Sequence, residues 1–214
     1  DLDVSLDLKN ASAEDRSKAA QAMAAANKEF RPMTREIILG KKNFILDGTA
    51  ASSGPTLKLK KELEDLGYDI LMVYVFASLE KALERNDSRF DRSGGKDRSL
   101  APAIVLRTWN NITQNYDLYK DEFGSNFVSV VNDKSLEKGG SMKSLEDLVD
   151  KYLTPYAPTN TKPKTDKEKA RSAKSKAELE KQVNDFVNSD KVEDIKANSV
   201  SKDEAKSRVN SFFA

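Results

Sequence analysis

The chain has 214 residues, which is enough for one ordinary domain with a substantial core and a smaller appendage. Hydrophobic residues make up 38% and charged residues 33%, and the formal net charge is only +1. This near-neutral balance provides no overall field to attract nucleic acid, and no apolar run approaches the roughly 20 residues that span a bilayer. We therefore expect a cytoplasmic protein that does not contact membranes.

The sequence contains no cysteine and no histidine. A disulfide framework, thiolate or imidazole metal sites, and a Ser-His-Asp triad are therefore excluded. Any chemistry must use carboxylates, hydroxyls, lysine, arginine and hard cations bound by oxygen.

The first helix is predicted over residues 12–39, with Pro32 expected to kink it or to start a new helix, and it ends at Gly40 because glycine suits a helix C-terminus. A short apolar run, Phe44 to Leu46, follows it and stops at Asp47. A strand that is buried on both faces of a parallel sheet has this continuous apolar character. We therefore expect a strand over residues 43–49 with Asp47 at its carboxyl end, the edge where open α/β sheets bind ligands.

Strand and helix patterns then alternate along the chain. Helices are predicted at residues 57–66, 78–86, 101–123 and 144–153, and strands at residues 70–76 and 127–133. Alternation of this kind is typical of α/β folds with a parallel sheet. We predict a three-layer parallel sheet flanked by helices, in a domain that covers residues 1–153.

Basic residues gather after the second predicted strand in a set of four arginines: Arg85, Arg89, Arg92 and Arg98. The last two flank a pair of glycines in a segment with few apolar residues, which is expected to be mobile. Guanidinium groups stabilise the charge on a transferring phosphoryl group, and a mobile lid can bring them to it after the substrates bind. The alternative is a solvated helix face, because acids nearby in the sequence can pair with these arginines: Glu80, Glu84, Asp87 and Asp91.

The composition changes after the last predicted helix of the domain. Residues 154–165 are rich in Pro, Thr, Asn and Lys and are predicted to form a linker. The helical extension over residues 166–214 has three short helical patterns with few apolar residues, so we expect it to dock on a protein partner. Residues 162–176 are locally basic, which is usually a solvated face, and no aromatic residues interleave them. Contact with a nucleic-acid backbone is the alternative.

Several pieces of this sequence, taken in order, resemble a known family: Asn43–Thr49, Leu63–Phe76, Ser78–Arg89 and Arg98–Pro102. They resemble P-loop kinases, and within that group the zeta-toxin-like kinases and their small-molecule and polynucleotide kinase relatives. The resemblance covers about residues 12–133. It implies a P-loop NTPase-like fold for the predicted sheet.

The resemblance also implies a function, namely ATP-dependent transfer of a γ-phosphoryl group to a hydroxyl of a small molecule or nucleotide sugar, with Mg²⁺ as a second cofactor. Asp47 would hold the Mg²⁺ or orient the acceptor, although an aspartate here can also simply cap a turn. The four arginines would act on the transferring phosphoryl group, with Arg89 and Arg98 favoured. Three hydroxyl residues would contact the acceptor or support a polar turn: Thr49, Ser52 and Ser53.

The phosphate-binding loop of this family, the Walker A region, is missing from the sequence. Such a loop needs glycines that let backbone N–H groups wrap phosphate, and a lysine that reaches the outer phosphates. Residues 1–39 contain no glycine, and Gly40-Lys41 and Gly95-Lys96 lack the upstream glycine. The simplest interpretation is a P-loop kinase whose first strand and loop are not in this chain, so residues 1–214 alone are predicted to be inactive. The alternatives are a catalytically inactive kinase-like structural or assembly protein that docks through its helical tail, and a polynucleotide end kinase.

Overall fold

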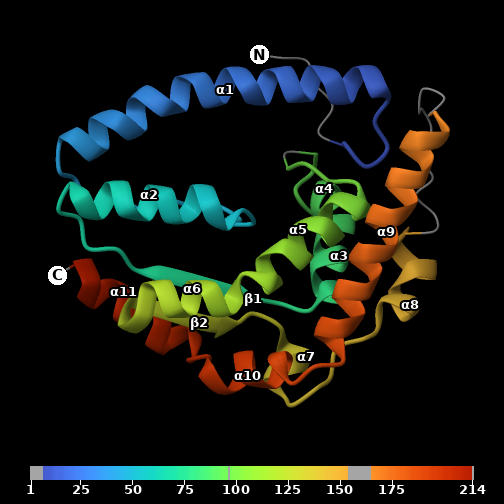
Figure 1. Cartoon of the computed structure of the whole chain (residues 1–214). Coiled ribbons are helices and arrows are strands. Elements are labelled where there is room, and N and C mark those ends of the chain that lie inside the picture. Colours follow the sequence, from blue (N-terminus) through green and yellow to red (C-terminus); the bar gives the residue numbers. More distant parts are fainter. Residues whose placement is uncertain (1–6, 96, 154–164, 214) are drawn as a thin grey trace.

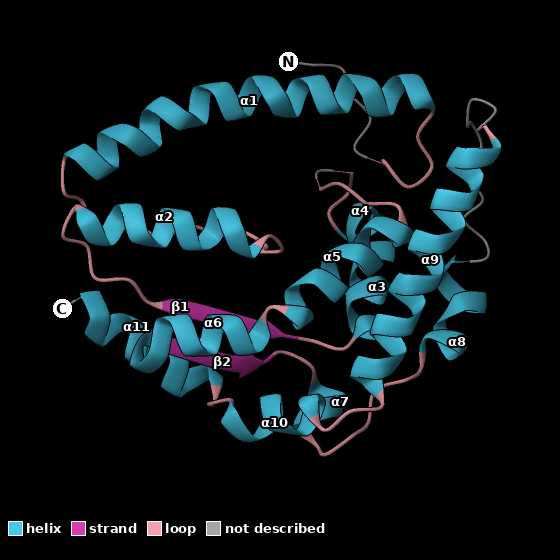
Figure 2. Cartoon of the chain, in the orientation of Figure 1, coloured by secondary structure: helices cyan, strands magenta, loops and turns pink. Residues whose placement is uncertain are grey.

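The structure is a computed structural model that describes residues 7–95, 97–153 and 165–213. Most of these residues are helical, in α1 (Ala13–Leu39), α2 (Ser53–Asp65), α3 (Leu79–Asp87), α4 (Arg89–Arg92), α5 (Pro102–Gln114), α6 (Tyr116–Phe123), α7 (Lys134–Glu137), α8 (Leu145–Leu148), α9 (Asp166–Val187), α10 (Lys191–Asn198) and α11 (Lys202–Phe213), with a 3-10 turn at Gly124–Asn126 and a π-helical turn at Val149–Leu153. The described strands, β1 (Met72–Phe76) and β2 (Phe127–Val131), form one parallel sheet (Figures 1 and 2). The fold is therefore mixed α/β and mostly helical.

Local sequence explains where the helices start and end. The Ser12 side chain accepts a hydrogen bond from the Asp15 amide at the start of α1, and Ser78 accepts one from the Lys81 amide at the start of α3. The helix predicted over residues 12–39 is confirmed, but it is one continuous helix that contains Pro32, so no new helix starts at the proline as the sequence had suggested. The single helix predicted over residues 101–123 is divided at Asn115 into α5 and α6.

The parallel sheet is the centre of the core. Both strands were predicted, and β1 pairs in register with β2 from Met72 opposite Phe127 to Phe76 opposite Val131. On one face, Tyr74 and Phe76 pack in a buried cluster with residues of the surrounding helices, among them Leu79, Leu83, Leu106, Trp109, Leu148, Val183, Phe186 and Ile195. The indole N–H of Trp109 donates to the Ala77 carbonyl 2.9 Å away, which fixes α5 against the end of β1. Helices from most of the described chain therefore share one core.

The C-terminal helices cover the sheet themselves. Val183 on α9 and Ile195 on α10 are completely buried, and Ala205 on α11 packs with Val128 and Val130 on the other face of β2. The outer edge of β2 is closed by the chain just after α10, where the Val200 amide donates to the Ser129 carbonyl at 2.8 Å. Most of the few apolar residues that the sequence places in this region therefore pack within the chain's own core, although Phe213 is 39% exposed.

Residues 43–49 do not form the strand expected of them. They form no regular secondary structure, and the side chains of Ile45 and Leu46 are 76% and 51% exposed. The segment is held at its start by Tyr68, whose hydroxyl donates to the Ile38 carbonyl at 3.0 Å and whose ring meets Phe44 edge-on. A strand is stable only beside a paired neighbour, and no described residue pairs with this segment. The three-layer sheet is therefore not confirmed, and the expectation that Asp47 ends a strand is wrong.

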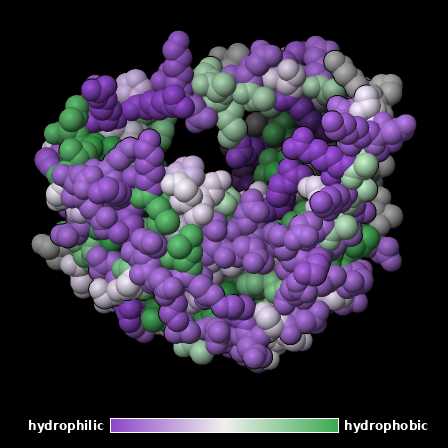
Figure 3. Space-filling model, in the orientation of Figure 1, coloured by the Kyte–Doolittle hydropathy of each residue, from purple (hydrophilic) through white to green (hydrophobic). Residues whose placement is uncertain are grey.

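Helix α1 lies apart from this core. None of its residues is buried, and its large apolar side chains at Met23, Phe30 and Met33 are 46%, 51% and 61% exposed. In Figure 1 it runs across the top of the molecule with α2 below it, and Figure 3 shows an opening beneath it. The stability of the domain therefore depends on the sheet and the helices around it much more than on α1.

Of the predicted linker over residues 154–165, all but Thr165, which caps α9, lies outside the described residues. Among the helices of the described ranges, none has the length and apolar character required to cross a membrane.

Packing of the C-terminal helices into the core predicts the effect of truncating a buried side chain there. Ile195→Ala should lower the free energy of unfolding by about 2–5 kcal/mol, because it leaves a cavity beside the sheet. The measurement is urea unfolding followed by circular dichroism. Ile45→Ala is the matched control, since its side chain is 76% exposed and its loss should change stability by less than about 0.5 kcal/mol. Equal effects of the two substitutions would contradict this packing.

Candidate functional site

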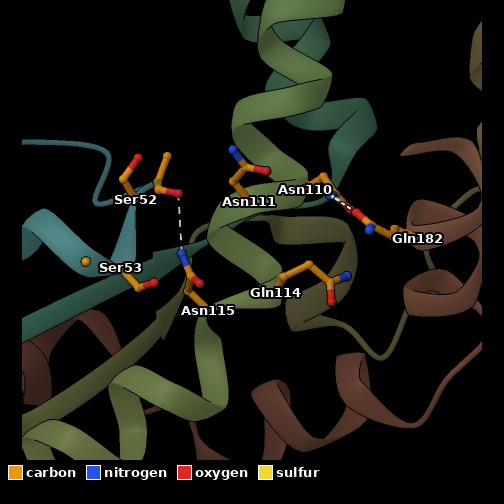
Figure 4. Close-up of a pocket in the computed structure, with 9 residues that line it drawn as sticks. Ser52, Ser53, Asn110, Asn111, Gln114, Asn115 and Gln182 are labelled. Atoms are coloured by element: carbon orange, nitrogen blue, oxygen red, sulfur yellow. Dashed lines mark hydrogen bonds between the residues drawn. The ribbon is translucent and has the colours of Figure 1, made fainter. Parts of the chain in front are cut away.

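A polar pocket lies where α2 begins. Its volume is about 510 Å³. It is bounded by the loop and first residues of α2, by the end of α5 and by one residue of α9, and its lining residues are Ala51, Ser52, Ser53, Gly54, Asn110, Asn111, Gln114, Asn115 and Gln182. Figure 4 shows that these side chains come from separate elements and surround one space. Hydroxyl and carboxamide groups therefore dominate the lining, and none of the nine residues is charged.

One side of the pocket is a carboxamide wall, formed by Asn110, Asn111, Gln114 and Asn115 at the end of α5. Asn110 and Gln114 are four residues apart, as are Asn111 and Asn115, so each pair lies on the same side of α5. The loop opposite is tied to this wall, because the Asn115 side-chain amide donates to the Ala51 carbonyl at 3.3 Å and the buried Tyr119 hydroxyl donates to the Ala50 carbonyl at 2.6 Å. The two sides of the pocket are therefore fixed relative to each other.

Two groups of the lining residues have no side-chain hydrogen-bond partner. The Ser52 side chain makes no capping bond at the start of α2, so the first N–H groups of this helix carry the partial positive charge of a helix N-terminus without a side-chain acceptor. The Oδ1 atom of Asn110 has no hydrogen-bond partner, although this residue is only 2% exposed. An unsatisfied buried acceptor costs about 1–3 kcal/mol, so this atom is a prominent anomaly of the wall.

The sequence-predicted acceptor residues are only partly brought together. Ser52 and Ser53 line the pocket. Asp47 and Thr49 are exposed on the irregular segment before it, and neither lines the pocket. The roles assigned to Asp47 and Thr49 stay predictions, whereas the two serines lie where a ligand could contact them.

The four arginines lie together on α3, α4 and the loop that follows. Arg85 donates to the Asn132 carbonyl, 2.8 Å away at the end of β2, and Arg92 donates to the Arg85 carbonyl at 3.0 Å. The guanidinium of Arg89 lies 3.5 Å from the carboxylate of Asp97, and a guanidinium nitrogen of Arg98 lies 3.4 Å from the sulfur of Met23. No described contact links these arginines to Asp47.

The loop that carries the arginines is closed at its base. Asn86 is 5% exposed, and its side chain both donates to the Leu100 carbonyl and accepts from the Leu100 amide, each at 2.8 Å. The segment expected to be mobile therefore begins and ends at a fixed point, and part of it is the short helix α4. Lys96 lies outside the described residues.

The carboxyl end of the sheet carries a buried acid that was not singled out from the sequence. Asp133 is 1% exposed and accepts hydrogen bonds from the amide and hydroxyl of Ser78, which follows β1, and from those of Ser135 at the start of α7. Burial alone raises the pKa of Asp133, but the hydrogen bonds from Ser135 and Ser78 outweigh it and lower the pKa below its ordinary value. This carboxylate therefore joins the ends of the two strands.

The described residues do not form a site for nucleotide and metal by themselves. No group of three or more acidic side chains in the described ranges is arranged to hold a metal ion. The full sequence contains no glycine-rich loop of the P-loop pattern. Asp47 alone is a single carboxylate, so the residues present do not make a complete site for ATP and Mg²⁺.

Sequence reasoning missed the carboxamide wall, although a signal for it was present. Asn110-Asn111 and Gln114-Asn115 repeat an amide pair at a spacing of four within a predicted helix, which places amides along one side of that helix. The contribution of Gln182 had no such signal, because only the packing of α9 brings it to the pocket. The hydrogen bond of the Asn86 side chain could not be predicted from the sequence either, since its partner is the backbone of Leu100, 14 residues away.

The hydrogen bonds of Asp133 predict a pH-dependent contribution to stability. Because its pKa is lower in the folded protein, the contribution is present above the ordinary pKa of an aspartate and is lost as the pH falls through the folded value. Asp133→Asn should lower the free energy of unfolding at pH 7 by about 1.5–3 kcal/mol, and the difference from the unmodified protein should shrink towards pH 3.

Urea unfolding between pH 7 and pH 3 measures this difference. Asp121→Asn, on the exposed surface of α6, is the matched control and should change stability little at any pH. A difference between the Asp133→Asn variant and the unmodified protein that stays constant with pH would show that the charge of Asp133 does not stabilise the fold.

Comparison with protein families gives one match, to the zeta toxin family, over residues 7–140. Comparisons with curated proteins and with solved structures gave no significant match. The matched residues run from just before α1 to the end of α7 and include β1, β2, the arginines and most of the pocket, but not α9 to α11. Because the match spans more than half of the chain, the protein belongs to the zeta toxin family, which is P-loop kinase-like.

Proposed function

We propose that this chain belongs to an ATP-dependent phosphotransferase that moves a γ-phosphoryl group to a hydroxyl of a small molecule or nucleotide sugar. The observation that carries the proposal is membership of the zeta toxin family, which indicates a nucleotide-dependent phosphotransferase in general. The pocket at the start of α2 supports it, because an uncharged polar cavity suits an acceptor that presents hydroxyl groups. Ser52 and Ser53 then contact the acceptor.

The arginines supply the positive charge in this proposal. The contact of Arg89 with Asp97 is a surface ion pair. Such pairs contribute at most about 1 kcal/mol to stability, so the Arg89 side chain can leave Asp97 for another partner at little cost. Arg98 has only a methionine sulfur as its described side-chain contact. These two side chains are therefore the ones best able to turn towards a phosphoryl group, whereas Arg85 is held by the Asn132 carbonyl.

The nucleotide cradle has to come from residues other than these. ATP supplies the transferred group and Mg²⁺ neutralises its charge when both are bound, and Asp47 is our candidate ligand for the ion. Within the described ranges β1 pairs only with β2, so its other edge has no strand partner there. A strand that leads into a glycine-rich loop can pair with the free edge of β1 and place the loop at the carboxyl end of the sheet.

The structural and polynucleotide alternatives have less support. A scaffold that docks on a partner through residues 166–214 would need apolar surface there, but Val183, Phe186 and Ile195 are already buried in the chain's own core. The basic residues at the start of α9 are exposed on a helix without interleaved aromatics, which favours a solvated face. Reading the coding sequence upstream of the Asp1 codon would distinguish the enzyme from the scaffold. Only the enzyme requires a glycine-rich loop that ends in Lys-Ser or Lys-Thr.

Residues 1–214 on their own should be inactive, since the phosphate-binding pattern is absent from their sequence. We expect no release or transfer of phosphate from γ-labelled ATP above the rate in buffer. The assay is thin-layer separation of the labelled products, with and without Mg²⁺. Turnover by this chain would show that another part of it holds the nucleotide and would overturn the cradle argument.

In a protein that contains this chain together with such a loop, Arg98→Ala should lower kcat by about 10²–10³, the usual effect of removing one donor to developing charge. Arg107→Ala is the matched control, because Arg107 is exposed on α5 outside the arginine cluster. Steady-state phosphotransfer kinetics with both variants measure the effect. Similar kcat values for the two variants would remove Arg98 from the mechanism.

A further inference from the structure

The residues just before α1 are bound to the loop that carries Arg98. We infer that Asp7 and Ser99 are positioning residues, which together hold Arg98 at a fixed place beside α1. The inference rests on the proposed function only in assigning Arg98 to the transferring phosphoryl group. Asp7 and Ser99 do not line the polar pocket, and they are expected to act on the reaction through Arg98 alone.

Ser99 is the point where the two segments meet. It is only 2% exposed, although it lies in a surface loop. Its hydroxyl donates to the Asp7 carboxylate at 2.8 Å and accepts from the Lys9 amide at 3.4 Å, and the backbones of Asp7 and Ser99 form an isolated parallel bridge. The buried hydroxyl therefore has partners both as donor and as acceptor. This contact joins segments that are 92 residues apart in the chain.

The carboxylate of Asp7 is a strong acceptor in this contact. Its second oxygen accepts from the Asn10 side-chain amide at 2.9 Å. Burial raises the pKa of Asp7, but the hydrogen bonds from Asn10 and Ser99 and the nearby charge of Lys9 outweigh it and lower the pKa below its ordinary value. The group is therefore ionised at neutral pH, and hydrogen bonds to an ionised acceptor are stronger than those between neutral groups.

The segment that carries Asp7 is itself held on two sides. The Arg16 guanidinium on α1 donates to the Leu8 carbonyl at 3.2 Å and to the Lys9 carbonyl at 3.3 Å. The Lys9 ammonium forms an ion pair with the Asp87 carboxylate at the end of α3. Residues 7–11, which we name the N-terminal strap, therefore form a fixed support for the arginine loop.

The backbone of Arg98 lies between neighbours that are also held. Directly after it, Ser99 is bound to the N-terminal strap, and both backbone groups of Leu100 are bound by the Asn86 side chain. Directly before it, the Asp97 carboxylate accepts from the Arg98 amide at 2.8 Å. The start of the Arg98 side chain therefore has a defined place, and the bond of Ser99 is what joins this place to the residues before α1.

The end of the Arg98 side chain, in contrast, is weakly held. A guanidinium nitrogen lies 3.4 Å from the Met23 sulfur, and a thioether is a weak acceptor. The guanidinium can therefore turn to a ligand from a fixed starting point. Such precision matters for phosphoryl transfer, because a misplacement of about 1 Å can lower a rate about 100-fold.

Arg89 offers a comparison within the same cluster. It lies on α4, and its described ion pair joins it to Asp97 and not to the N-terminal strap. Loss of the bond between Asp7 and Ser99 should therefore disturb Arg98 and leave Arg89 in place.

The first test measures the backbone order of Arg98 in the ¹⁵N-labelled chain by NMR relaxation. The order parameter S² of the Arg98 amide should fall from about 0.85 to below about 0.6 in both Asp7→Ala and Ser99→Ala. The double variant should show no further fall, because both changes remove one bond. Asp7→Asn keeps an oxygen that accepts from the Ser99 hydroxyl and should preserve the order. Ser125→Ala, at an exposed serine, is the matched control.

The second test uses a protein that contains this chain together with a glycine-rich loop. Ser99→Ala should lower kcat about 10- to 100-fold and change KM less than about twofold, because the arginine acts on the transition state. In an Arg98→Ala background the same substitution should cause no further loss. In an Arg89→Ala background it should cause the full loss, which a general disturbance of the fold would not distinguish.

Circular dichroism checks that each variant is folded, and the half-buried Asp7 provides the readout if Ser99→Ala does not fold. Unchanged order of Arg98 in Asp7→Ala would overturn the inference, and so would a further loss of kcat from Ser99→Ala in the Arg98→Ala background. A fall in the order of Arg98 together with normal phosphotransfer by Arg98→Ala would support the strap and count against the proposed role of Arg98. The two ideas therefore fail by different observations.

Discussion

Parallel pairing of β1 with β2 is the constraint on which the rest of this structure depends. Two parallel strands cannot be joined by a tight turn, so the chain must leave the end of β1 and return to the start of β2 through α3 to α6. That crossover brings α5 back along the sheet, where Trp109 bonds to the end of β1 and the following amides face the start of α2. The pocket is therefore a consequence of how the crossover packs.

The two outer edges of this small sheet differ in their hydrogen bonding. The outer edge of β2 is closed by the chain after α10, and Asp133 links the carboxyl ends of both strands through Ser78. The outer edge of β1 pairs with nothing in the described ranges, and residues 43–49 form no strand, with Ile45 and Leu46 exposed. An unpaired strand edge is a favourable place for another strand to add, which is why the free edge of β1 is central to the proposed completion of the nucleotide site.

The C-terminal helices complete the hydrophobic core of the zeta toxin segment in this protein. Residues 7–140 define the family, yet Val183, Phe186 and Ile195 fill the same core as Tyr74 and Phe76. The family segment would lose a large share of its apolar contacts without these helices. The extension is thus part of the domain's stability, and through Gln182 it is also part of the pocket.

The sequence by itself determined the local features: helix starts at Ser12 and Ser78, the C-cap at Gly40, and the continuous apolar strands β1 and β2, because capping and apolar patterns act over a few residues. It also indicated the family through motifs around Asp47 and the arginines. Only the tertiary structure decided that residues 43–49 stay unpaired, that Asn86 closes the arginine loop, and that Gln182 meets Asn110. These outcomes depend on partners distant in the chain, and a pattern of neighbouring residues carries no information about whether such a partner is present.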